Sequence, residues 1–74
     1  MKNIINDSIK ISNPITMGLA MDKIDWKRIT GRMIRVHYNY DENGQVKSGA
    51  TRMVVPEHQT TADVIQHIMT EISK

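Results

Sequence analysis

Residues 33–55, MIRVHYNYDENGQVKSGATRMVV, carry the clearest structural signal in this sequence. Over residues 33–40 apolar and polar side chains alternate, and β-branched and aromatic residues are frequent, which is typical of a strand with one buried face. Asn43-Gly44 then predicts a two-residue turn, because a type I′ turn needs positive φ at both central positions. A second strand over residues 46–55 would end at Pro56, which has no backbone N–H for a sheet. The stretch therefore predicts an antiparallel β-hairpin.

A two-residue turn also fixes which residues of the hairpin lie opposite each other. Arg35 would face Arg52 on one side of the sheet, with His37 on the same side. Tyr38 and Tyr40 would lie on the other, apolar side. A three-residue loop or a bulge would instead reverse the faces of one strand.

Residues 60–72 predict a helix. Thr60 or Thr61 can cap its first turn, and Asp63 is placed where the helix dipole favours an acidic side chain. Its apolar residues recur at helical spacing and form one stripe. The stripe consists of Val64, Ile65, Ile68, Met69 and Ile72.

The first 32 residues give weaker signals. Ile9 and Ile11 alternate with polar neighbours and predict a short strand. Asn13-Pro14 is a favourable helix start, with Asn as the cap and Pro at the first helical position. Apolar residues then recur at helical spacing at Met17, Ala20, Met21 and Ile24, and Thr30-Gly31 would end that helix.

The expected fold class is therefore α+β: a small antiparallel hairpin or sheet packed by one or two helices, in the order β-α-β-β-α. We expect a single small domain over residues 1–74. Residues 1–12 are either a flexible tail or an edge strand. A third strand comes from this segment or from a second copy of the chain, because a lone hairpin is marginally stable.

The hairpin, the following loop and the helix resemble half of a ubiquitin-like β-grasp domain, as in Ras-association modules. The resemblance rests on Val54-Val55-Pro56 and on Thr60-Thr61-Ala62-Asp63-Val64-Ile65, and it covers about half of the chain. It implies a β-grasp-like half. A complete β-grasp needs further strands after the helix, and no functional residue is transferred from the resemblance.

Composition excludes several classes of protein. The chain has 74 residues and no Cys, so disulfides and thiolate metal sites are absent. No apolar run is long enough to span a bilayer, and residues 1–10 have no signal-peptide pattern, so we expect a cytoplasmic protein. His37, His58 and His67 have no metal-ligand spacing, and no nucleophile or phosphate-binding motif is present. We expect no cofactor, no metal and no enzymatic activity.

Positive charge is concentrated in the middle of the sequence. Net charge is +2, yet residues 23–40 hold five Lys and Arg residues against one Asp. Like charges that face each other across a sheet are destabilising, so an Arg35–Arg52 pair suggests a surface for an anion. A lone Trp beside basic residues is typical of an interface, although it is also typical of a core. The candidate partner-binding residues are Trp26, Lys27, Arg28, Arg32, Arg35, His37 and Arg52.

These features favour a small non-enzymatic binding or regulatory protein, of the inhibitor or adaptor type, that docks on a protein with an acidic surface. The alternative is a nucleic-acid-binding protein that uses the same basic hairpin face. A third possibility is a structural or assembly subunit that acts by strand addition. We also expect that the chain can form a homodimer, since a core this small contributes only about 3–5 kcal/mol to folding stability.

Overall fold

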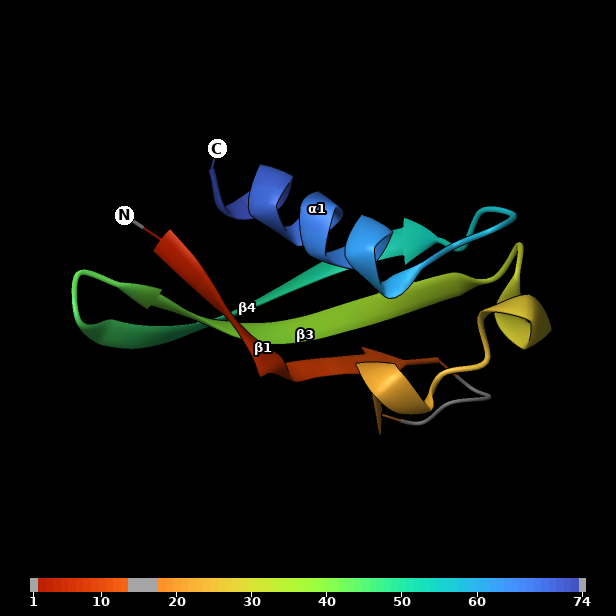
Figure 1. Ribbon diagram of the computed structural model, residues 1–74, viewed down its shortest axis with the longest axis horizontal. Coiled ribbons are helices and arrows are strands. Elements are labelled where there is room, and N and C mark those ends of the chain that lie inside the picture. The colour runs from red at the N-terminus through yellow and green to blue at the C-terminus, as the bar shows by residue number, and fades with distance from the viewer. Residues whose placement is uncertain (1, 14–17, 74) are drawn as a thin grey trace.

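The computed structural model describes residues 2–13 and 18–73 (Figure 1). Within these ranges four strands form one antiparallel sheet in the order β2-β1-β3-β4, and a single α-helix follows them. The α+β class predicted from the sequence is confirmed at this level. The elements are β1 (Lys2–Ser12), β2 (Leu19–Ala20), the 3-10 helices η1 (Met21–Lys23) and η2 (Trp26–Ile29), β3 (Met33–Glu42), β4 (Gln45–Val54) and α1 (Thr61–Ile72).

The hairpin of β3 and β4 has the turn and the register that its sequence predicts. Asn43 has φ of 54° and Gly44 has φ of 84°, as a type I′ turn requires. The Gly44 N–H donates a hydrogen bond of 2.9 Å to Asp41 Oδ1. The two strands stay in one register along their whole length, and Arg35 lies opposite Arg52. The hairpin faces are therefore those expected from the sequence.

Strand β1 is longer than the Ile9–Ile11 segment predicts, and it lies between β2 and β3. Its register against β3 shifts between Ile5 and Lys10, which marks a bulge. Ser8 fills the gap in the ladder: its Oγ accepts a hydrogen bond of 2.8 Å from the Asn39 N–H and donates one of 2.6 Å to the Ile5 carbonyl. The third strand of the sheet thus comes from the same chain, and no second copy is needed to supply it.

The helix predicted to start at Asn13-Pro14 is wrong for the residues that the structure describes; Pro14 and Met17 lie outside them. Gly18 has φ of 86°, a left-handed conformation that interrupts a helix. Its N–H donates to the Ile11 carbonyl at 3.1 Å, which turns the chain into β2. Two 3-10 helices follow in place of the helix. Met21 and Ile24 still pack against the core, so their apolar pattern reflects burial rather than helical periodicity.

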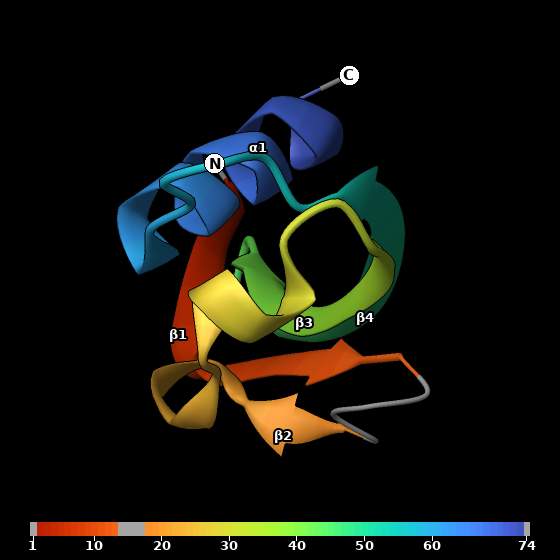
Figure 2. The same ribbon diagram turned by 90° about the vertical axis from the view of Figure 1, so that its right-hand side faces the viewer.

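Helix α1 begins with a capping box. The Thr60 Oγ1 accepts a hydrogen bond from the Asp63 N–H, and the Asp63 carboxylate accepts one from the Thr60 N–H. Val64, Ile68 and Ile72 are buried beneath the helix as predicted, whereas Met69 is exposed. Figure 2 shows the sheet curving around this helix, with α1 across its concave side.

The core lies between α1 and the covered face of the sheet. The buried apolar side chains of this layer come from β1, β3, α1, η2 and the residue after β4. Tyr38 is buried and Tyr40 is partly buried beside it, as expected from the register. Burial raises the pKa of the Tyr38 hydroxyl, and the nearby Tyr40 and Glu71 raise it further. The opposite face of the sheet contributes none of these buried side chains.

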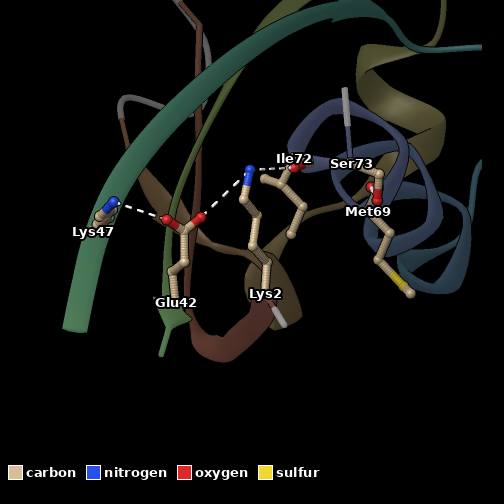
Figure 3. A network of polar contacts seen from close by, with 6 residues as sticks. All are labelled: Lys2, Glu42, Lys47, Met69, Ile72 and Ser73. Carbon is tan, nitrogen blue, oxygen red and sulfur yellow. Dashed lines mark hydrogen bonds and ion pairs between the residues drawn. The ribbon is translucent and has the colours of Figure 1, made fainter. Parts of the chain in front are cut away.

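A polar network ties the far end of the sheet to the end of α1 (Figure 3). Lys2 Nζ donates to the Ile72 carbonyl at 2.8 Å and pairs with Glu42 at 3.4 Å, and Lys47 Nζ meets the same carboxylate at 2.9 Å. The hydrogen bond from Lys47, followed by the contact with Lys2, lowers the pKa of Glu42. A cation at a helix C-terminus is electrostatically favourable. The network therefore holds β1, the hairpin and α1 together.

The arrangement reproduces only the order of elements in a β-grasp half. The hairpin is followed by a loop and then by α1, as the resemblance implies. The strand beside β3 is β1, which precedes the hairpin and runs antiparallel to β3. The described residues hold no strand after α1.

Candidate functional site

The candidate site is the open face of the sheet, the face turned away from α1. Side chains alternate between the two faces of a strand. Since Ile34 and Val36 of β3 are buried under α1, Arg35 and His37 between and beside them must point to the other side. Both are exposed. The hairpin turn therefore places these two polar side chains on the open face.

Neighbouring strands add two cations to the open face. Arg52 of β4 lies directly opposite Arg35, and Lys10 of β1 pairs with His37 on the other side of β3. All four side chains are exposed. Lys10, Arg35, His37 and Arg52 thus form a band across three adjacent strands, which we call the basic band.

The band has no carboxylate partner within the described part of the chain. The ion pairs there are those of Lys2 and Lys47 with Glu42, at the hairpin end of the molecule. The nearest carboxylate on this face of β3 is Asp41, four positions beyond His37 and so about 13 Å along the strand. Placing two arginines opposite each other costs about 0.2–1 kcal/mol of stability. The band is therefore a local concentration of uncompensated positive charge.

Apolar side chains lie at both ends of the same face. Met33 and Val54 face each other across β3 and β4, next to the arginine pair, and are 57% and 52% exposed. Val46 lies near the hairpin turn and is 66% exposed. Arginine and methionine beside exposed apolar groups resemble the composition of protein interfaces. The open face thus combines charge with apolar surface.

Three of the seven predicted site residues, Arg35, His37 and Arg52, come together on this face. The structure adds Lys10, which the sequence analysis missed. Alternation with Ile9 and Ile11 places Lys10 on the polar side of the predicted short strand, but no local pattern predicts the pairing of β1 with β3 that brings Lys10 beside His37. Arg28 lies on η2 and Arg32 lies in the loop before β3, and both are exposed. Neither is on a strand of the sheet, so neither belongs to the basic band.

Trp26 and Lys27 line a different feature, a shallow groove of about 970 Å³ between η2 and the loop from β4 to α1. Trp26 is partly buried against the core. Lys27 shares the groove with the carboxylates of Asp25 and Glu57. Gln59 is buried in the groove wall; its Nε2 donates to the Thr60 carbonyl at 2.8 Å, and its Oε1 has no hydrogen-bond partner. The groove is lined by one cation and two carboxylates, unlike the basic band.

Comparisons of the chain with protein-family models, curated proteins and solved structures found no significant match. Within residues 2–13 and 18–73, no group of His, Asp and Glu side chains is placed to hold a metal ion. No helix in these ranges has the length and apolar character needed to cross a bilayer. The argument for function therefore rests on the open face itself.

Proposed function

We propose that this protein is a non-enzymatic binding protein of the inhibitor or adaptor type, which docks the open face of its sheet on an acidic surface of another protein. The observation that carries the proposal is the Arg35–Arg52 pair. Two arginines directly opposite each other reduce stability unless an anion lies over them. Carboxylates of a partner would satisfy both guanidinium groups through charge-assisted hydrogen bonds.

The surroundings of the pair favour a protein as the partner. Met33 and Val54 would bury apolar area beside the arginines, as the centre of a protein interface does. A single-stranded nucleic acid would be expected to need stacking platforms, and the two tyrosines of β3 belong to the covered face. A duplex could be bound by the basic band through phosphate contacts alone. The experiment must therefore distinguish a protein partner from a nucleic acid.

The test is a pull-down with the tagged chain from lysate of its source, with and without nuclease, followed by affinity measurement on the recovered partner. The key variant is Arg35→Glu/Arg52→Glu. The control is Lys27→Glu/Arg28→Glu, which changes net charge equally but leaves the open face intact. We expect a nuclease-resistant partner that the first variant loses and the control retains. Circular dichroism would verify that both variants are folded.

Other outcomes would reject the docking proposal. If both double variants recovered the partner equally, the open face would not be the site. If nuclease removed the partner, and affinity for duplex DNA or RNA fell steeply with salt, the nucleic-acid function would replace it. Several phosphate contacts give a linear fall of log K against log salt, with a slope near −0.9 for each contact on duplex DNA.

A further inference from the structure

The two edges of the sheet differ in how well they are protected from pairing with another strand. At one edge, β2 spans only Leu19–Ala20, and the exposed part of β1 beyond it carries the bulge and the charges of Lys2 and Asp7. Short strands, bulges and charges are devices that protect an edge. The other edge is β4, with ten residues, an uninterrupted register, no Pro and two charged residues. Strand β4 is therefore the longer and more regular edge, and its only protective charges are Lys47, which is paired with Glu42, and Arg52.

The turn determines which backbone groups this edge exposes. In a type I′ hairpin the residues that flank the turn, Glu42 and Gln45, form a hydrogen-bonded pair, and such pairs recur at every second residue. The odd-numbered residues of β4 then bond to β3. The hydrogen bonds of β3 agree with this alternation, since the N–H of the odd-numbered Asn39 is directed away from β4 and donates to Ser8 of β1. The N–H and C=O groups directed outward from the edge belong to Val46, Ser48, Ala50, Arg52 and Val54.

We infer that β4 pairs antiparallel with β4 of a second copy of this chain, with Ala50 on the twofold axis. In that register Ala50 faces the partner's Ala50, Ser48 faces the partner's Arg52, and Val46 faces the partner's Val54. Every outward group of the strand is then used, with about ten backbone hydrogen bonds, two in each close pair. The exposed valines at the two ends of the strand meet each other across the interface.

Strand length and charge disfavour the two neighbouring registers. Centring the pair on Ser48 would place Arg52 opposite the partner's turn, beyond the end of β4. Centring the pair on residue 52 would set two arginines directly opposite each other, which is unfavourable. With Ala50 on the axis, Arg52 lies opposite a hydroxyl, and the two Arg52 positions are four residues apart along the strand, about 13 Å. That separation exceeds the Debye length of about 8 Å at physiological salt. The two basic bands can therefore join into one continuous sheet surface without strong mutual repulsion.

Hydrogen exchange measures this pairing directly. In a monomer the amides of Ser48, Ala50 and Arg52 face solvent and exchange quickly, while those of Gly49 and Thr51 are protected by β3. In the dimer all five are protected. We expect the even-numbered amides to slow by tenfold or more as protein concentration rises, in step with dimer formation in sedimentation equilibrium. A chain that stays monomeric at millimolar concentration, or dimerises with those amides still fast, would overturn the inference.

Charge exchange on the axis tests the register. Ala50→Lys and Ala50→Glu each put like charges face to face across the axis. We therefore expect the dimer dissociation constant of each variant alone to rise by at least about tenfold. An equimolar mixture of the two variants should form heterodimers with a dissociation constant within about threefold of the wild-type value, because opposite charges then meet. Ala50→Ser, which keeps the size and the N–H, is the matched control. Variants that dimerise like wild type, or a mixture that fails to recover, would refute the register.

This inference does not depend on the proposed docking function. Sedimentation and hydrogen exchange need no partner protein. Because Arg52 also lies in the inferred dimer interface, sedimentation of the Arg35→Glu/Arg52→Glu variant shows whether a failed pull-down reflects the open face or a lost dimer. Failure of the dimer inference and failure of the docking proposal can therefore be told apart.

Discussion

The two faces of the sheet are built from alternate residues of the same strands, and they have opposite character. On the covered face Ile34, Val36 and Tyr38 pack under α1, and on the open face Arg35 and His37 lie in solvent. The hairpin turn separates the two sets, because a slip of one residue would exchange them. The difference indicates that one face supplies stability, and our proposal assigns binding to the other. Substitutions on the two faces should therefore affect different properties.

The largest effect is expected under α1. Ile68 is fully buried between the helix and the sheet. Ile68→Ala should lower the free energy of unfolding by about 2–5 kcal/mol, through lost burial and the cavity that remains. Urea denaturation followed by circular dichroism measures this change.

A domain of this size has little stability to lose, so a milder variant is needed beside it. Ile68→Val should lower the unfolding free energy by about 0.5–1.5 kcal/mol and keep the fold. His37→Ala on the open face is the control, and it should stay within about 0.5 kcal/mol of wild type. Equal losses at positions 68 and 37 would contradict the division of roles between the faces.

A second, smaller effect is expected where β4 passes under the Tyr38 ring. A Cβ added to Gly49 would lie 2.7 Å from Tyr38 Cζ, closer than ordinary contact allows. Gly49→Ala should therefore lower the unfolding free energy by about 1–3 kcal/mol, because the ring must move out of its packed position. Thermal unfolding of the variant, with Ser48→Ala on the opposite face as control, measures the effect.

The clash at Gly49 also predicts coupling between the two positions. In the background Tyr38→Leu the ring is absent, so Gly49→Ala should lose much of its effect on stability. A double-mutant cycle isolates that coupling. If Gly49→Ala were equally destabilising in both backgrounds, the backbone of β4, and not the Tyr38 ring, would be the reason for glycine at this position.

The parts of the fold that the sequence predicts correctly are those with local signals. Asn43-Gly44 specifies both the turn and, through it, the register of the hairpin. Thr60 and Asp63 specify the start of α1 through contacts three residues apart. Arg35, His37 and Arg52 follow from that register, which is why this portion of the candidate site could be predicted before the structure.

The parts predicted wrongly or missed depend on contacts between distant segments. Asn13-Pro14 and the apolar spacing after it favour a helix, yet the left-handed Gly18 and pairing with β1 produce a short strand and 3-10 turns. Lys10 joins the basic band only because β1 pairs with β3, across a bulge that no local pattern indicates. Tertiary pairing of this kind can override local propensity.

The smallest effect tests the charge on the open face, and its sign differs from the others. Arg35→Thr removes the like charge opposite Arg52 and introduces a β-branched residue, which strands favour. We expect the unfolding free energy to rise by about 0.2–1 kcal/mol at low salt, with a smaller gain at high salt because repulsion is screened. Urea denaturation at two ionic strengths measures this.

Arg28→Thr is the matched control for that substitution, because Arg28 is exposed on η2 and faces no second arginine across a strand. It should change stability little and without the same dependence on salt. If Arg35→Thr were instead destabilising, the arginine pair would be contributing to the fold, and the argument for an anionic partner would lose its basis. A more stable Arg35→Thr variant that also binds its partner more weakly would show that stability has been given up on the open face for function, as is common at binding sites.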